Sequence, residues 1–415
     1  MGLKCEECAA LPAAAVRKRR RLGSGAMIGG GLVVLLVAII IVAIVLPQFG
    51  PQSRPGGTAV APAGRWTSAG DVPGIRGATR SVELADGRIL VAGGGLGSVP
   101  LDGAAVFDPA TGRWAPTGRL NTARRGNAMA VLSDGRAIVA GGIAASTLLT
   151  SVEIYDPRSG TWTEAVPMKV ARLQPTLTVL GDGRVLVAGG LVQSGSTPVA
   201  TASAEILDAG QKAWSPTRSP MSDARYEGTA TRLSDGRVLM AGGRRDATDS
   251  AEVLNTAELF DPVVGIFTRT APMREARRAH SAVALAGSGV LVLAGSSRAD
   301  VLRSAEVYDA GAGSWSQVGA LSQARRLQAA TLLTDGRVLV AGGEAVQSGA
   351  RSSLTSAELY DPSRRRWARA AGMACVRSDL ALASLPQGRA LAAGGDAASP
   401  GAPPLAQGCS EIYQP

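Results

Sequence analysis

The sequence predicts an all-β fold, a seven-bladed β-propeller, and three observations carry this prediction. A phrase that reads TDGRVLVAGG from Thr334 recurs about every fifty residues in seven copies, two of them degenerate. Each full copy joins an Asp-Gly turn, an apolar run rich in β-branched residues and two glycines, which is typical of a tight hairpin leading into a buried strand. A second phrase with a fixed Glu-to-Trp spacing follows, and no 3.6-residue periodicity occurs after the first fifty residues.

The first phrase establishes the period of the chain. Its copies are ADGRILVAGG from Ala85, SDGRAIVAGG from Ser133, GDGRVLVAGG from Gly181, SDGRVLMAGG from Ser234, GSGVLVLAGS from Gly287, TDGRVLVAGG from Thr334 and PQGRALAAGG from Pro386. A repeat of this length is the signature of an array of similar supersecondary units. Asp-Gly turns separate an incoming strand a from a buried strand b in each unit.

The second phrase supplies strands c and d of each unit. Its Glu and Trp keep one spacing in four copies: Glu153 to Trp162, Glu205 to Trp214, Glu306 to Trp315 and Glu358 to Trp367. Ala105 replaces the Glu of the first copy, and Phe267 replaces the Trp of the fourth. Because every Trp of the chain occupies this slot, we interpret these aromatic residues as a repeated packing device.

The two ends of the repeat array predict how the ring closes. The last repeat stops after strand c, at Tyr413, while a lone strand d containing Trp66 precedes the first full repeat. Pairing these two strands completes a seventh blade and leaves no open sheet edge. The propeller is therefore expected to span residues 64–415 and to be monomeric.

These repeats resemble the kelch family, whose blades carry paired glycines and a Tyr and Trp at separations like that of Tyr360 and Trp367. The resemblance covers roughly residues 64–415. It implies a β-propeller fold but does not specify an activity, because one fold hosts many functions.

The N-terminal residues predict a membrane anchor. Residues 27–46 carry no charge and are long enough to cross a bilayer as a helix, and the basic run RKRRR at residues 17–21 precedes them. The positive-inside rule then leaves residues 1–26 in the cytoplasm and the propeller outside it, in the periplasm or at the cell surface. Residues 47–63 form a linker rich in Pro and Gly. A cleaved signal peptide is the alternative, although the apolar run exceeds a usual signal core.

Strand alternation within a blade assigns two faces to the propeller. The Asp-Gly turns and the c-to-d turns share one end, here called the turn face, and Trp66 begins its strand there. The b-to-c connections, which vary in length, and the start of every strand a share the other end, here called the loop face. Since variable loops on a rigid scaffold usually carry recognition, we expect a partner to bind the loop face, pointing away from the membrane.

One arginine per repeat is expected at the start of strand a, in a ring around the channel. These residues are Arg76, Arg124, Arg172, Arg225, Arg278, Arg325 and Arg377. In the structural interpretation each pairs with the Glu of strand c or with loop carbonyls. In the ligand interpretation the ring forms a positive funnel for an anionic ligand. In kelch domains that present substrates to ubiquitin ligases, arginines at similar places bind acidic peptides, so the resemblance adds some support to the ligand interpretation. We favour the structural interpretation, and the two roles can overlap.

The cysteines and the single histidine limit metal and redox chemistry. Cys375 and Cys409 lie two residues before Arg377 and Glu411, and we predict a disulfide between them in an oxidising compartment. Cys5 and Cys8 have no further Cys or His nearby to complete a zinc site. The resemblance includes copper radical oxidases, whose site uses two His, two Tyr and a Cys, but this chain has only His280. No cofactor and no metal are expected.

The resulting functional expectation is a membrane-anchored, non-catalytic kelch propeller that binds a protein or glycan, with an acidic ligand as one candidate. The net charge is +10, of which residues 1–46 contribute six Lys/Arg and two Asp/Glu, or +4, leaving +6 for the remainder. Few aromatic residues occur outside the repeat slots, and an extracytoplasmic location argues against nucleic-acid binding. The alternative is a kelch-type carbohydrate enzyme such as a sialic-acid mutarotase, which relies on Arg and Glu.

Overall fold

The computed structural model describes residues 62–74, 77, 79–96, 99–248, 251–287, 289–347, 349–397 and 408–415. These residues belong to one compact unit, Ala61–Pro415. The predicted cytoplasmic tail, membrane helix and nearly all of the linker lie outside the described residues. Among the residues that are described, no helix has the length and apolar character needed to cross a membrane.

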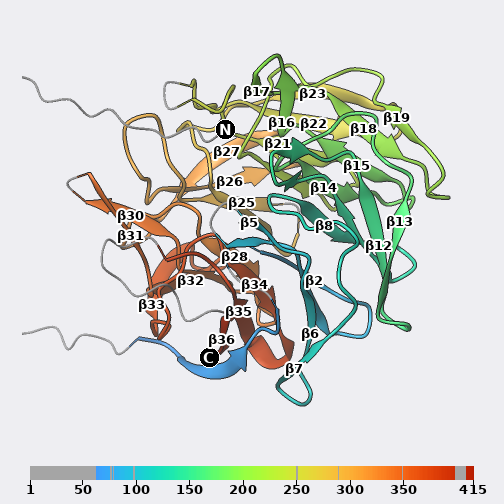
Figure 1. Cartoon of the computed structure of the whole chain (residues 1–415). Coiled ribbons are helices and arrows are strands. Elements are labelled where there is room, and N and C mark those ends of the chain that lie inside the picture. The colour runs from blue at the N-terminus through green and yellow to red at the C-terminus, as the bar shows by residue number, and fades with distance from the viewer. Residues whose placement is uncertain are drawn as a thin grey trace, which may run out of the picture. The chain divides into compact units, whose positions relative to one another are not determined.

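Seven four-stranded antiparallel sheets form the unit, which confirms the predicted seven-bladed propeller (Figure 1). The strands of each blade are given from the channel outwards. Blade 1 contains β2 (Arg80–Glu83), β3 (Ile89–Ala92), β6 (Ala104–Asp108) and β7 (Arg113–Pro116). Blade 2 contains β8 (Ala128–Val131), β9 (Ala137–Ala140), β12 (Val152–Asp156) and β13 (Thr161–Ala165). Blade 3 contains β14 (Thr176–Val179), β15 (Val185–Ala188), β18 (Ala204–Leu207) and β19 (Trp214–Pro216). Blade 4 contains β20 (Thr229–Arg232), β21 (Val238–Ala241), β22 (Ala257–Asp261) and β23 (Ile266–Thr270). Blade 5 contains β24 (Ser281–Ala284), β25 (Gly289–Leu293), β26 (Ala305–Asp309) and β27 (Ser314–Val318). Blade 6 contains β28 (Ala329–Leu332), β29 (Val338–Ala341), β32 (Ala357–Asp361) and β33 (Arg366–Ala370).

The seventh blade contains both ends of the propeller, as the sequence predicts. Its strands are β34 (Ala381–Ser384), β35 (Ala390–Ala393), β36 (Cys409–Gln414) and β1 (Arg65–Asp71). Trp66 lies opposite Tyr413 in the β1–β36 ladder, with ring centroids 5.4 Å apart. The innermost strands of neighbouring blades contact one another all the way round the ring. No blade is therefore left with an unpaired edge at the closure.

Burial of strand b explains why its sequence is continuously apolar. All four residues of β3, β9, β15, β21 and β29 are buried, because each sheet is covered on both faces by its neighbours. The hydrophobic clusters accordingly combine residues of adjacent blades, as where Trp162 of β13 packs with Leu90 of β3. Across strands c and d, the repeated aromatic residues pair as expected, for example Tyr155 with Trp162 at 5.1 Å.

The glycine pairs allow neighbouring blades to approach each other. Gly141 and Gly142 both have positive φ, 66° and 99°. A Cβ atom at Gly141 would lie 2.6 Å from the carbonyl oxygen of Arg172, in the next blade. Only glycine combines this backbone conformation with such a short inter-blade distance.

The loop face carries short two-stranded ribbons that extend the b-to-c connections. These are β4 (Gly95–Leu96) with β5 (Val99–Pro100), β10 (Ile143–Ala144) with β11 (Thr147–Leu148), β16 (Leu191–Ser194) with β17 (Thr197–Ala200), and β30 (Glu344–Gln347) with β31 (Ala350–Ser353). The chain enters the propeller on the opposite face, since Arg65 pairs with Gln414 at the end of strand c. The described structure thus agrees with the predicted entry at the turn face.

Candidate functional site: the channel mouth and the arginine brace

A buried arginine–glutamate pair recurs at the loop face of six blades. In blade 2, Arg124 donates to the carbonyl oxygens of Gly141 and Ser151 at 2.9 and 3.0 Å and to the Glu153 carboxylate at 2.7 Å. Glu153 also accepts the backbone N–H groups of Asn121 and Thr122, in the segment that enters the blade. Each pair therefore ties together the start of strand a, the glycine turn and strand c, and we call this unit the brace.

The same brace appears with little variation around the ring. The ion pairs are Arg124–Glu153 at 2.7 Å, Arg172–Glu205 at 3.1 Å, Arg225–Glu258 at 2.7 Å, Arg277–Glu306 at 3.0 Å, Arg325–Glu358 at 3.1 Å and Arg377–Glu411 at 2.8 Å. All of these side chains are at most 4% exposed. Burial lowers the pKa of Arg124, Arg172, Arg225, Arg325 and Arg377, and the paired carboxylate opposes this effect by favouring the charged form.

The structure corrects one of the seven predicted arginines, and it does not describe another. In blade 5 the brace residue is Arg277, while Arg278 lies one position further and donates to Glu227 at 2.8 Å. Arg76 is outside the described residues. The N–H of Gly395 in blade 7 donates to the carbonyl oxygen of Gly77 in blade 1, as the N–H of Gly94 donates to that of Arg124.

Burial also corrects the expected position of the ring. The five remaining predicted residues, Arg124, Arg172, Arg225, Arg325 and Arg377, are at most 3% exposed and bond within their own blades. The structure therefore favours the structural interpretation and does not supply the accessible ring of guanidinium groups that the ligand interpretation needs. Each guanidinium is drawn inward because its blade offers carbonyl, hydroxyl or sulfur, and carboxylate acceptors together.

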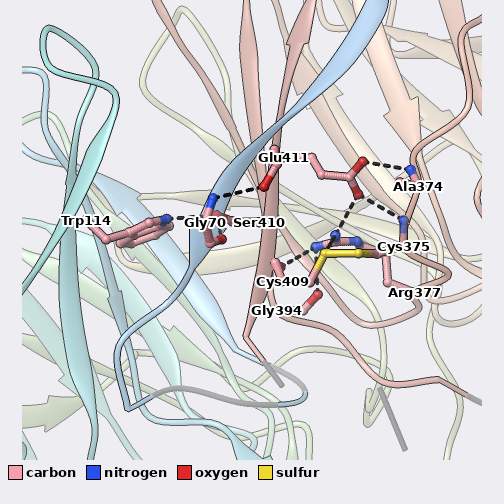
Figure 2. The surroundings of a disulfide bond; sticks show 10 residues. Gly70, Trp114, Ala374, Cys375, Arg377, Gly394, Cys409, Ser410 and Glu411 are labelled. Carbon is pink, nitrogen blue, oxygen red and sulfur yellow. Dashed lines mark hydrogen bonds and ion pairs between the residues drawn. A yellow bond between two sulfur atoms is a disulfide. The ribbon is translucent and has the colours of Figure 1, made fainter. Parts of the chain in front are cut away.

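The predicted disulfide between Cys375 and Cys409 is present, inside the brace of blade 7 (Figure 2). Arg377 donates to the Sγ atom of Cys409 at 2.9 Å, where other braces have a Ser or Thr hydroxyl. In blade 6 the corresponding side chains, Gln323 and Ser356, form a hydrogen bond of 2.6 Å. Blade 7 thus replaces a repeated non-covalent contact with a covalent bond.

The disulfide lies beside the junction of blades 7 and 1. The hydroxyl of Ser410, the residue after Cys409, donates to the carbonyl oxygen of Gly70 at 2.6 Å. It also accepts the indole N–H of Trp114 at 2.8 Å (Figure 2). One side chain therefore joins the last strand, the first strand and the outer strand of blade 1.

The channel mouth is lined by residues with an unusual backbone conformation. Two positions after the brace arginine, the residue has a positive φ in six blades: Gly126, Gln174, Glu227, Ala279, Leu327 and Asp379. Left-handed backbone is costly for residues other than glycine, and it persists only where the surrounding structure imposes it. Here hydrogen bonds between consecutive blades fix it, such as the bond from the Leu327 N–H to the carbonyl oxygen of Ala279. We call these six residues the inner ring.

A pocket of about 330 Å³ occupies this mouth. All seven blades contribute to its lining, with Arg80, Asn127, Gln174, Thr176, Glu227, His280, Gln328 and Asp379 as its main polar residues. Arg80 pairs with Asp379 at 3.1 Å, and Glu227 pairs with Arg278 at 2.8 Å and Arg244 at 3.2 Å. The mouth therefore presents a mixture of both charges, which suits polar ligands better than a uniform positive funnel would.

His280 is the only histidine of the chain and lines this pocket. Burial lowers its pKa to about 3, so its ring is neutral at physiological pH. Its Nε2 atom lies 3.1 Å from the hydroxyl of Thr229. In the described part of the chain, the cluster with metal-ligating atoms is Cys375, Cys409 and Glu411, but its sulfurs are joined and Glu411 is bound to Arg377.

The sequence reasoning missed the inner ring and the exposed charges beside it. The repeat itself held the signal, because the inner-ring residue stands two positions after each brace arginine and differs in every copy. Arg80 was missed because its significance appears only when it is compared with the equivalent residues of the other blades. The first residue of strand a is small in those six blades: Ala128, Thr176, Thr229, Ser281, Ala329 and Ala381.

Comparison with known proteins identifies the repeats. The Kelch motif matches residues 124–169 and 325–374, which belong to blades 2 and 6. A solved structure of a fungal alcohol oxidase of the AA5 family, in complex with copper, has a TM-score of 0.68 and 15% sequence identity, covering 85% of this chain and 76% of that chain. No curated protein matches the sequence.

The fungal oxidase shares the fold with this chain, and the identity is too low to imply more. A copper site of that kind draws on imidazole ligands. With one histidine, buried and bonded to Thr229, the residues of this chain do not fit such a centre. No reaction step through copper follows from the likeness.

Proposed function

The chain is a kelch-repeat β-propeller, and we propose that it works as a binding protein whose recognition surface is the channel mouth and surrounding ribbons of the loop face. Kelch propellers generally mediate protein binding, and the partner here is a protein or a glycan. The proposed surface consists of partly exposed groups of this face, such as Arg80, Asp379 and Glu227, and not of the buried braces.

The observation that carries the proposal is the inner ring. Six blades hold one residue each in the same left-handed conformation, and bonds between blades fix several of them, yet their side chains range from Gly and Leu to Glu and Asp. A constant backbone with variable side chains around one pocket is the arrangement expected of a recognition surface on a rigid scaffold.

Membrane anchoring through residues 27–46 remains part of the proposal. The chain enters the propeller at the turn face, since Arg65 of β1 lies opposite Gln414. In this proposal the chain joins the propeller at the turn face, which leaves the recognition surface free to meet a partner outside the membrane. The periplasm or cell surface would also be oxidising enough to keep the Cys375–Cys409 bond.

We place the protein among non-catalytic kelch propellers because the titratable groups at the mouth are poorly suited to proton transfer. The Glu227 carboxylate is already engaged by Arg244 at 3.2 Å and Arg278 at 2.8 Å. His280 is buried and neutral, with a pKa of about 3. The mutarotase alternative is tested by following anomer exchange of sialic acid with the full chain, where acceleration above the buffer rate would contradict the non-catalytic assignment.

Site-specific photo-crosslinking tests the recognition surface. A photoreactive amino acid is placed at Gln193 or Arg351, both exposed on loop-face ribbons, and as a matched control at Arg158, exposed on the turn face. In cells of the source organism we expect one shared partner to crosslink to both loop-face positions and not to Arg158. Equal crosslinking from Arg158, or none from the loop face, would contradict the proposal.

A further inference from the structure

The channel mouth has a smaller polar extension beside blade 1. In blade 1, Ala105 stands where the six braced blades have the Glu. A cavity of about 120 Å³ lies here and shares Arg80, Asn127 and Asp379 with the channel pocket. Its other polar side chains are Arg125, Gln174 and Asp396.

Two buried donors in this cavity have no hydrogen-bond partner among the described residues. They are the Nε atom of Arg125 and the Nδ2 atom of Asn127, whose residue is 3% exposed. Buried polar groups are nearly always bonded, because an unmade hydrogen bond costs free energy. The exceptions therefore point to an acceptor supplied from outside the chain.

Arg125 has no carboxylate partner among the described residues, unlike Arg278 and Arg326 at the equivalent positions of blades 5 and 6. Arg278 and Arg244 are paired with Glu227, and Arg326 with Glu344. Within the described residues, no carboxylate oxygen lies within 4.0 Å of Arg125. Gly95 makes room for this side chain, since a Cβ atom there would lie 3.1 Å from Cδ of Arg125.

Arg80 brings a second guanidinium to the same cavity. Among the described residues it donates only through Nη1, to Asp379 at 3.1 Å and to the carbonyl oxygen of Thr79 at 3.2 Å. Its side chain is 38% exposed, and the Ala, Ser or Thr at equivalent positions of other blades could not reach into the mouth. An arginine has five N–H donors, so Nε and Nη2 can still bind an incoming acceptor.

We propose that this cavity binds a carboxylate group of the ligand, with Arg125 and Asn127 as its principal donors and Arg80 as a further donor. This proposal rests on the proposed binding function and assigns a chemical class to part of its ligand. A guanidinium matches the two oxygens of a carboxylate. A phosphate dianion fits less well, because Asp379 and Asp396 also face the cavity and would repel the additional charge.

Saturation-transfer NMR with acetate tests the proposal on the full chain in mild detergent, at fixed ionic strength. We expect acetate to give a saturable signal with a Kd on the order of millimolar, and the neutral isostere acetamide to give none. The signal should fall at least about tenfold in Arg125→Gln and persist in the matched control Arg326→Gln, whose arginine is paired with Glu344. Asn127→Ala, which removes only one neutral donor, should weaken binding less than Arg125→Gln.

Further arms distinguish the source of the carboxylate. A short peptide with a free C-terminus is compared with its C-terminal amide, and glucuronate with glucose. Stronger binding of the free peptide indicates a chain end, and stronger binding of glucuronate an acidic glycan; either supports the proposal. No saturable acetate signal, or an unchanged signal in Arg125→Gln, would overturn it, even if loop-face crosslinking succeeded and the wider binding proposal survived.

Discussion

Blade 1 and blade 2 show two ways of building the same unit. Blade 2 has a complete brace, with Arg124 and Glu153 at most 1% exposed and 2.7 Å apart. Blade 1 has Ala105 at the place of the glutamate. A buried arginine without its carboxylate is costly, so the two blades stabilise their loop-face ends differently. The comparison teaches that a four-stranded blade can form without the carboxylate half of the brace.

The position of blade 1 in the ring is also informative. Its neighbour, blade 7, carries the disulfide in its own brace, and Ser410 joins that blade to Trp114 of blade 1. The reinforced blade thus lies beside the one that lacks the brace glutamate. We interpret blade 1 as specialised for its exposed group, Arg80, while its neighbours supply stability.

Breaking one half of a brace should have the largest effect. Glu153→Ala leaves Arg124 buried without its carboxylate and should lower the free energy of unfolding by about 3–5 kcal/mol. The double variant Arg124→Met with Glu153→Leu removes both charges and should cost clearly less than the single one. Urea unfolding followed by tryptophan fluorescence measures both variants. A double variant as unstable as the single one would contradict the view that the unpaired buried charge causes the loss.

The covalent and non-covalent forms of one contact can be compared between blades 7 and 6. Replacing both cysteines, Cys375→Ser with Cys409→Ser, should lower the free energy of unfolding by about 3–4 kcal/mol, because the disulfide closes a loop with a separation of 34 residues. The matched change Gln323→Ala removes the corresponding hydrogen bond to Ser356 and should cost about 1 kcal/mol. Equal losses in the same unfolding assay would show that the disulfide adds nothing to the brace.

The sequence revealed the fold and the brace because both depend on residue types that recur at fixed spacing. The spacing misassigned the brace arginine of blade 5. The arginine is found by counting ten residues back from the Asp of the turn, and in blade 5 that Asp can be aligned with residue 287 or 288. These alignments give Arg277 and Arg278, so both are arginine. The sequence also placed the arginines in the open channel, because whether a guanidinium turns toward solvent or into its blade depends on acceptors from three separate segments.

The inner ring and the carboxylate cavity could not be predicted by the same reasoning. A positive φ at Leu327 or Gln174 is imposed by the neighbouring blade and is not a property of either residue type. Arg80 and Arg125 come from different blades and line one cavity only when blades 1 and 2 pack together. Features that arise between repeats, unlike those within one repeat, leave little trace in the spacing of residues.

The smallest expected change in stability concerns the third residue after the brace arginine. This residue is Asn127 in blade 2 and His280 in blade 5. The pKa of His280 is lowered to about 3 in the folded state, against 6.5 when exposed. The unfolded chain therefore binds the extra proton between these values, and folding stability falls as pH drops through this window. At pH 5 the loss attributable to His280 should be about 2 kcal/mol relative to pH 8. His280→Gln, which can still bond Thr229, should reduce the difference in unfolding free energy between pH 8 and pH 5 by that amount, whereas an unchanged difference would mean that the buried ring does not govern this pH dependence.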